Sequence, residues 1–164
     1  MQWLLLAAIL VILCFGFVLL FGAPYVPTLP TQAKLALDMI DLESGDTLLE
    51  LGSGDGKILL AAARRGLNAV GFELNPILVF VSRLRTWRYR RQVKVVWGNL
   101  WQTEKWPPAE GIFVFILQKH MKKLDNKIIQ WHTKPVKLVS FAFTVPDKTP
   151  TKQDKRGVYV YEYR

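Results

Sequence analysis

Residues 50–56 constrain the fold of this chain more than any other stretch. They read Glu-Leu-Gly-Ser-Gly-Asp-Gly and directly follow the apolar residues 47–49. Glycine has no Cβ and accepts positive φ, so a strand that ends in such a turn lets the backbone approach a ligand closely. The helix expected from residue 57 would offer its free N-terminal amides to a carboxylate or phosphate. The sequence therefore predicts a strand, a ligand-binding turn and a helix in succession.

The spacing of the glycines separates two kinds of cofactor. A dinucleotide fingerprint needs G-x-G-x-x-G, but the glycines here are 52, 54 and 56, and Lys57 stands where the third dinucleotide glycine would fall. An acid followed by x-G-x-G-x-G resembles motif I of class I S-adenosylmethionine-dependent methyltransferases. From this stretch alone, an ordinary strand-to-helix turn or another nucleotide-binding fold is the alternative.

Two more strand ends carry polar side chains that suit such a cofactor. A second short strand, residues 68–72, ends at Glu73, and a third, residues 93–97, is followed by Asn99. In doubly wound folds an acid at the end of the second strand accepts hydrogen bonds from ribose hydroxyls. In the methyltransferase pattern, the residue after the third strand binds the exocyclic amine of adenine. Three such positions in order favour S-adenosylmethionine, with Asn75-Pro76 as the start of a helix.

The remaining chain alternates between strand and helix patterns. After residue 46 we expect strands at 47–51, 68–72, 93–97, 111–116 and 136–141, and helices at 57–65, 76–87 and 120–131. This alternation predicts an α/β fold with a Rossmann-like, doubly wound and mostly parallel sheet. No helix fits between residues 141 and 158, so we expect the last strand, 158–163, to return antiparallel to strand 136–141 and to form an edge.

The N-terminal residues predict a membrane anchor. Residues 3–22 carry no charge, and twenty helical residues span about 30 Å, the thickness of a bilayer core. No basic residue precedes them and no good cleavage site follows, which favours an uncleaved anchor over a signal peptide. We expect an anchor at 1–23, a proline-rich linker at 24–32 and a catalytic domain at 33–164. The first cation after the span is Lys34, which places this domain on the cytoplasmic or mitochondrial matrix side.

One segment holds much of the excess positive charge of this chain, whose net charge is +9. Apolar residues at helical spacing predict that the helix 76–87 has a buried face made of Ile77, Phe80, Val81, Leu84 and Trp87. The opposite side and the following turn are basic, through Arg83, Arg85, Arg88, Arg90 and Arg91. These arginines either form a solvated helix end, favoured by the helix dipole, or contact anionic lipid headgroups. We do not expect a nucleic-acid partner.

Three stretches resemble one family in particular. They are Pro24-Tyr25-Val26-Pro27-Thr28, Gly52-Ser53-Gly54-Asp55-Gly56 and Glu73-Leu74-Asn75-Pro76. They are similar to the membrane-anchored protein lysine methyltransferases that act on the mitochondrial adenine nucleotide translocase and on the ATP synthase c-subunit, and to small prokaryotic relatives. The resemblance covers nearly the whole chain and implies a class I methyltransferase fold, truncated at the C-terminus. Glu50 stands where Asp is commoner, and the segment after residue 141 is short.

The resemblance implies a role for each matching residue. The methionine part of S-adenosylmethionine would be held by Glu50, Gly52, Ser53, Gly54 and Gly56. Glu73 would bind the ribose, Leu74 would lie against the adenine ring, and Asn99 would bind the adenine amine. Tyr25 would fold over the cofactor or acceptor, or rest at the membrane interface. Gln118 is better placed than His120 to orient an acceptor amine, and no metal ligand is assigned.

The acceptor expected from this resemblance is a lysine of a membrane-associated protein. Methyl transfer needs an acceptor lone pair in line with the methyl carbon, and an apolar pocket near Trp101 and Phe115 would favour the neutral amine. The alternatives are methylation of a small molecule or lipid, and a membrane-bound scaffold of the same fold without activity. No Asp/Asn-Pro-Pro-Tyr sequence is present, which argues against methylation of a nucleobase amine.

Overall fold

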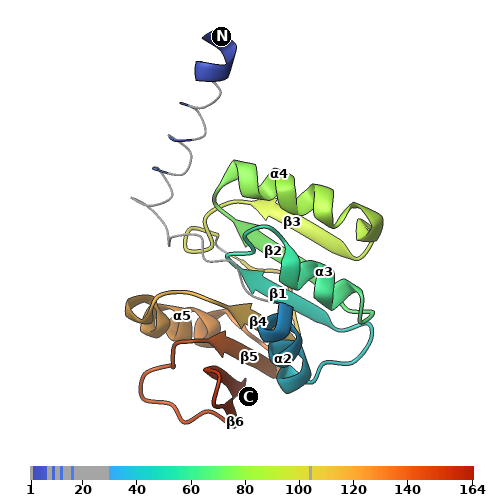
Figure 1. Ribbon diagram of the computed structural model, residues 1–164. Helices are drawn as coiled ribbons and strands as arrows, with labels where there is room; N and C mark the ends of the chain where they lie inside the picture. Colours follow the sequence, from blue (N-terminus) through green and yellow to red (C-terminus); the bar gives the residue numbers. More distant parts are fainter. Residues whose placement is uncertain (1, 7–8, 10–11, 13–15, 17–29, 104) are drawn as a thin grey trace.

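Helices and strands alternate along the chain (Figure 1). The structure is a computed structural model and describes residues 2–6, 9, 12, 16, 30–103 and 105–164. Its elements are α2 (Pro30–Ile40), β1 (Thr47–Leu51), α3 (Lys57–Ala63), β2 (Asn68–Glu73), α4 (Pro76–Arg85), η1 (Trp87–Tyr89), β3 (Val93–Trp97), β4 (Gly111–Val114), α5 (Gln118–Trp131), β5 (Val136–Phe141), β6 (Lys152–Asp154) and β7 (Val158–Tyr163). α2 begins inside the predicted linker, since a proline is tolerated in a first helical turn.

The strands of the described chain form one seven-stranded sheet in the order β3-β2-β1-β4-β5-β7-β6. The first five strands pair in parallel, and β7 runs antiparallel to both β5 and β6. The predicted doubly wound, mostly parallel sheet and the antiparallel last strand are therefore confirmed. The prediction that the last strand forms an edge was wrong, because β6 pairs with its outer side. This three-residue strand, Lys-Gln-Asp, has no apolar pattern that the sequence could reveal.

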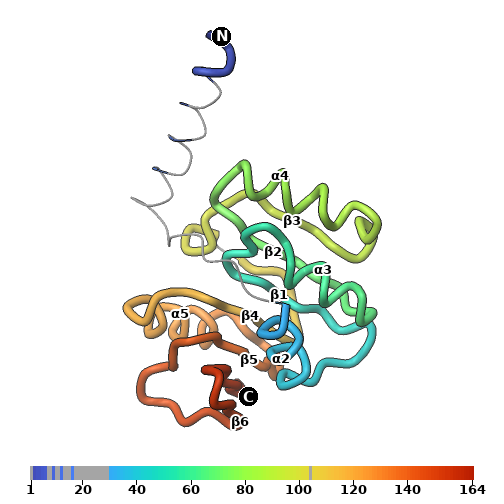
Figure 2. The backbone as a smooth tube through the Cα atoms, in the orientation of Figure 1, coloured from blue at the N-terminus to red at the C-terminus, as the bar shows by residue number. Residues whose placement is uncertain are grey.

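The order of the strands creates a switch point at the centre of the sheet. From β1 the chain moves outward through β2 to β3, and it then returns to place β4 on the other side of β1 (Figure 2). In open α/β sheets, ligands bind at the carboxyl ends of the strands beside such a point. The glycine turn of residues 52–56 follows β1 at this edge.

The strands contribute to two hydrophobic clusters, one on each face of the sheet. In β1, Leu48 belongs to a cluster with side chains of α2, α3 and α4, whereas Leu49 belongs to a cluster with side chains of α5. Among the described residues, α5 is the only helix in this second cluster. Trp106, from the loop after β3, is 3% exposed and belongs to the same cluster.

Side-chain contacts hold the C-terminal strand against α5. Asp125 is buried; its Oδ1 accepts a hydrogen bond from Tyr163 Oη at 2.8 Å and lies 2.7 Å from Lys148 Nζ. Burial, followed by the contact with Asp125, raises the pKa of Tyr163, so its phenol stays protonated and donates. These contacts fix the polar stretch between β5 and β7 without a helix.

The predicted membrane anchor, residues 3–22, lies mostly outside the described residues. Within the described part of the chain, no helix has both the length and the apolar character needed to cross a bilayer. The side chains of Trp3, Leu4, Leu5 and Leu6 are exposed.

The buried face of α4 differs from the prediction. α4 buries Leu78, Val79 and Ser82. The face expected to be buried is instead half-buried at Ile77 and Val81 and exposed at Phe80, Leu84 and Trp87. The prediction was wrong because α4 contacts the glycine turn through the small side chain of Ser82, and hydrophobic spacing does not detect such a contact.

This orientation of α4 predicts opposite results at two leucines. Leu78→Ala should lower the free energy of unfolding by about 2 kcal/mol or more, because it removes a buried side chain. Leu84→Ala should change it by less than about 0.5 kcal/mol, because that side chain is exposed. Denaturant titration of the two variants measures both values, and equal losses would contradict the orientation.

Candidate functional site

The turn between β1 and α3 has backbone angles that residues other than glycine rarely adopt. The φ angles are +90° at Gly52, +51° at Gly54 and +79° at Gly56. Each positive φ would cost an ordinary L-residue about 1–2 kcal/mol. The N–H groups of Gly52 and Ser53 both donate to the carbonyl oxygen of Phe72 at 2.9 Å, which ties the turn to β2. The glycines are therefore required by the geometry of the turn.

The turn is crowded on one side and open on the other. A Cβ added to Gly56 would lie 2.3 Å from Ser82 Oγ in α4. Apart from its own chain neighbours, no atom of the described residues lies within 4 Å of a Cβ added to Gly52, at the carboxyl end of β1. The open side leaves room for a ligand beside the turn.

Glu73, at the end of β2, bridges the glycine turn and the start of α4. Its carboxylate accepts hydrogen bonds from the N–H of Gly54 and the N–H of Asn75, each at 2.8 Å. Asn75 Oδ1 in turn accepts from the N–H of Ile77 at 2.9 Å, so it caps α4 as predicted. A carboxylate has lone pairs beyond these two bonds, so Glu73 can also accept from a diol.

Glu50 is a buried carboxyl group with an unpartnered oxygen. Its side chain is 3% exposed, and Oε2 has no hydrogen-bond partner among the described residues. Burial, with repulsion from Glu73 and Asp55, raises the pKa of Glu50 well above its usual value. Ser53 Oγ is also buried and has no hydrogen-bond partner among the described residues. Two such atoms beside an open turn fit a ligand that donates hydrogen bonds, as the α-amino group of S-adenosylmethionine does.

The buried Glu50 predicts a stability change that depends on pH. Folding raises its pKa, so stability is lost as the pH rises through that raised value. Glu50→Gln stays neutral and keeps the shape, so we expect it to raise the free energy of unfolding at about pH 8 and to leave it nearly unchanged at about pH 4. Denaturant titration of the ligand-free chain at both pH values measures this. An equal gain at both would contradict the role of the charge.

Leu74 and Asn99 lie at the same edge of the sheet as Glu73. The N–H of Gly98 donates to the carbonyl oxygen of Glu73 at 3.0 Å, which places the turn that carries Asn99 beside it. Asn99 Oδ1 accepts from the N–H of Trp101 at 2.9 Å. Leu74 is half-buried and directly follows Glu73. The structure therefore brings these predicted residues together at the carboxyl ends of β2 and β3.

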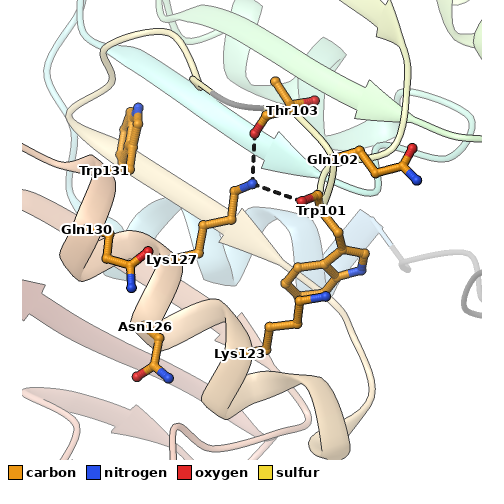
Figure 3. Close-up of a pocket in the computed structure, with 8 residues that line it drawn as sticks. All are labelled: Trp101, Gln102, Thr103, Lys123, Asn126, Lys127, Gln130 and Trp131. Atoms are coloured by element: carbon orange, nitrogen blue, oxygen red, sulfur yellow. Dashed lines mark hydrogen bonds between the residues drawn. The ribbon is translucent and has the colours of Figure 1, made fainter.

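A cleft beside the Asn99 turn lies between the loop after β3 and α5 (Figure 3). It is lined by Trp101, Gln102, Thr103, Lys123, Asn126, Lys127, Gln130 and Trp131. Lys127 Nζ points from α5 into the loop and donates to the carbonyl oxygens of Trp101 at 3.3 Å and Thr103 at 2.8 Å (Figure 3). Burial, then repulsion from Lys123, lowers the pKa of Lys127. Lys127 thus fixes the Asn99 loop, and no pattern in the sequence indicates this contact.

Of the two residues expected to orient the acceptor, the structure describes Gln118 but not Tyr25. Gln118 Nε2 donates to the carbonyl oxygen of Thr144 at 3.0 Å, and its Oε1 accepts from the Thr144 N–H at 3.3 Å. Gln118 therefore joins the start of α5 to the segment after β5. Tyr25 lies outside the described residues. The ring of His120 lies 5.7 Å from that of Trp101, and burial lowers its pKa.

Phenylalanines gather where β4 and β5 end. Phe115 follows Val114, which pairs with Leu51 just before the glycine turn. Its ring lies 5.0 Å from that of Phe141 and 6.4 Å from that of Phe143. Phe143 and Trp101 both pack against the cluster that contains Trp106, whereas Phe115 packs against the cluster on the other face of the sheet.

Asp55 connects the glycine turn to α4. Its Oδ2 lies 2.9 Å from Arg85 Nη1 and 3.3 Å from Lys57 Nζ. Arg85 therefore points toward the turn, whereas the other arginines of the basic segment form no salt bridge with a described residue and Arg83 donates to the carbonyl oxygen of Val95.

Comparison with known proteins agrees with this geometry. Residues 50–152 match the family model described as the ANTKMT methyltransferase domain. The chain is 33% identical over 137 residues to the lysine N-methyltransferase of the ATP synthase c-subunit from Xenopus laevis, with 82% of this chain and 60% of the relative covered. It is 32% identical over 130 residues to the adenine nucleotide translocase lysine N-methyltransferase of Mus musculus, with 77% and 56% covered. The chain thus spans about three fifths of the length of the c-subunit lysine N-methyltransferases of Xenopus laevis, Homo sapiens and Rattus norvegicus.

A solved structure agrees as well. An RNA methyltransferase from Salinibacter ruber, in complex with S-adenosyl-L-homocysteine, superposes with a TM-score of 0.77 at 28% identity, covering 84% of this chain and 92% of that one. The Rossmann-like sheet is therefore that of a class I methyltransferase. The glycine turn, Glu73 and Asn99 all lie within the matched residues, and this chain belongs to the family of the ANTKMT methyltransferase domain.

Proposed function

We propose that this chain transfers a methyl group from S-adenosylmethionine to a lysine side chain of a membrane-associated protein. The observation that carries the proposal is the buried Glu50, whose Oε2 has no partner in the described chain and lies at the end of β1 before the open Gly52 turn. Relatives named as lysine N-methyltransferases support lysine as the acceptor.

Different residues at this edge of the sheet bind different parts of the cofactor. Glu50 and Ser53 hold the methionine part through the unpartnered Oε2 and Oγ, and the glycines 52, 54 and 56 let the backbone of the turn approach it closely. Glu73 accepts from the ribose hydroxyls, Leu74 packs on the adenine ring, and Asn99 binds the adenine amine. S-adenosylmethionine supplies an already activated methyl group, so the protein has to bind, orient and exclude water.

The acceptor amine enters where Phe115, Phe141 and Phe143 meet. A lysine must lose its proton before it can attack, and burial in apolar surroundings lowers an amine pKa. Phe115 follows Val114, which pairs with Leu51 just before the glycine turn, and its ring with those of Phe141 and Phe143 would provide such surroundings. Gln118 and Tyr25 are the candidates for orienting the amine, and the bonds between Gln118 and Thr144 hold the entrance between α5 and β5.

A membrane anchor at residues 3–22 keeps the enzyme near such acceptors. The absence of charge in this segment and the exposed side chains of Trp3, Leu4, Leu5 and Leu6 support it. In this arrangement residues 33–164 form the catalytic domain, on the cytoplasmic or mitochondrial matrix side, because basic residues begin at Lys34. Arg83, Arg88, Arg90 and Arg91 contact anionic lipid headgroups, whereas Arg85 is paired with Asp55.

Transfer of a labelled methyl group tests this proposal. The chain is incubated with isolated membranes and methyl-labelled S-adenosylmethionine, and protein, lipid, RNA and small molecules are then separated. We expect the label in protein, at lysine by mass spectrometry, and no transfer by the Glu73→Ala variant. Label in lipid, RNA or a small molecule would contradict the lysine acceptor. Cofactor binding without any transfer would favour the scaffold.

A further inference from the structure

The outer face of α4 and η1 is a row of exposed apolar side chains. Phe80 and Leu84 are each 68% exposed and Trp87 is 63% exposed. Their spacing of four and then three residues puts them on one side of the helix, away from the buried Leu78 and Val79. α4 lies along β3 at one end of the sheet (Figure 1). We call Phe80, Leu84 and Trp87 the α4 ridge.

A second exposed tryptophan lies near the start of this helix. Trp97, the last residue of β3, is 65% exposed. Its Nε1 donates to the carbonyl oxygen of Leu74 at 3.0 Å, so the indole is held two residues before the start of α4. Tryptophans with one polar contact and an exposed apolar ring are typical of membrane–water interfaces.

The surroundings of the α4 ridge are positively charged. Residues 74–103 contain no Asp or Glu, and α4 with the residues just after it carries Arg83, Arg88, Arg90 and Arg91. None of these four forms a salt bridge with any residue that the structure describes, although Arg83 Nη2 donates to the carbonyl oxygen of Val95 at 2.9 Å. The Arg90 guanidinium lies 5.0 Å from the centre of the Trp87 ring, so charge and apolar surface are interleaved.

The exposed apolar side chains and the arginines around them together favour one kind of binding surface for the α4 ridge. A second copy of the chain would bring these four arginines, which have no ion pair among the described residues, against four others, and like-charge repulsion opposes this. An apolar protein groove would leave the cations unpaired. A bilayer with anionic lipids accepts both parts, since apolar side chains enter the boundary of the acyl chains while arginines meet the headgroup phosphates.

We propose that the α4 ridge docks on an anionic membrane, with Phe80, Leu84 and Trp87 inserted below the headgroups. This goes beyond headgroup contact by arginines alone, because the apolar side chains carry part of the binding. It builds on the membrane location in the proposed function, but it requires neither cofactor nor methyl transfer. Docking would leave the buried side of α4 facing the glycine turn.

A fluorophore on the ridge tests the insertion in the full chain. The single native cysteine is removed by Cys14→Ser, and an environment-sensitive fluorophore is attached through Leu84→Cys. The matched control carries it through Ile129→Cys, which is 52% exposed on α5 at the other face of the sheet. Both proteins are reconstituted in bilayers of zwitterionic lipid alone or with phosphatidylserine, each containing a lipid-bound quencher.

We expect the label at position 84 to shift to the blue and to be quenched several-fold more than the label at 129 when phosphatidylserine is present. Replacing Arg88, Arg90 and Arg91 by Gln should bring quenching at 84 down to the control value. Equal quenching at 84 and 129 would overturn the proposal and leave the ridge for a protein or nucleic-acid partner. S-adenosylmethionine titration of the same samples shows separately whether the cofactor part of the proposed function fails.

Discussion

Glu73→Ala is expected to weaken S-adenosylmethionine binding by about 100-fold or more. Hydrogen bonds to a charged group are worth about 1.5–3 kcal/mol each, and 1.4 kcal/mol is a tenfold change in affinity. The substitution removes the proposed acceptor of the ribose hydroxyls. It also leaves the N–H groups of Gly54 and Asn75 without their partner. Calorimetric titration of the full chain in detergent measures the loss.

A deoxy ligand separates these two effects of Glu73. S-adenosylhomocysteine lacking the ribose 2′-hydroxyl should bind the native chain more weakly than the complete ligand, and Glu73→Ala should remove that difference. If Glu73 only supports the backbone of the turn, the variant weakens both ligands by the same factor. Unchanged affinity for both would exclude a ribose-binding role.

Gly56→Ala is expected to lower the free energy of unfolding by about 2–5 kcal/mol. A positive φ costs an alanine about 1–2 kcal/mol, and overpacking adds about 1–3 kcal/mol. The overpacking is specific, since the new Cβ would lie 2.3 Å from Ser82 Oγ and 3.1 Å from Ser82 Cα. Denaturant titration of the ligand-free variant measures the change.

Gly52→Ala is the matched control for Gly56→Ala. Gly52 also has a positive φ, of +90°, but among the described residues only its own chain neighbours lie near the added methyl group. We expect it to lose only about 1–2 kcal/mol of stability, while it impairs cofactor binding because the methyl group enters the ligand space. Adding Ser82→Gly to Gly56→Ala should restore part of the stability, since the closest atoms disappear. Purely additive losses in the double variant would contradict the clash.

The sequence predicts the cofactor side of the site because its signals are local. A glycine turn after an apolar strand and an Asn-Pro helix start each depend on neighbouring residues, and the structure shows the positive φ of Gly52 and the cap at Asn75. The polar groups at the ends of β1, β2 and β3 come together because parallel neighbouring strands end at one edge.

The predictions that fail depend on contacts between distant residues. Ser82 is buried because the glycine turn approaches it, and this reverses the face of α4 that apolar spacing favours. Lys127 reaches the carbonyl oxygens of a loop more than twenty residues earlier. β6 forms because β7 offers a free edge, and its residues carry no strand pattern. Such contacts exist only once the sheet has formed.

The two sides of α4 have different contacts. Its inner side contacts the glycine turn through Ser82 and through the ion pair of Arg85 with Asp55. Its outer side carries the α4 ridge. Thermodynamic reciprocity applies to any such shared element. If docking of the ridge changes the cofactor affinity by some factor, the cofactor must change the docking equilibrium by the same factor. The fraction of the protein docked on the membrane would then change with the concentration of S-adenosylmethionine.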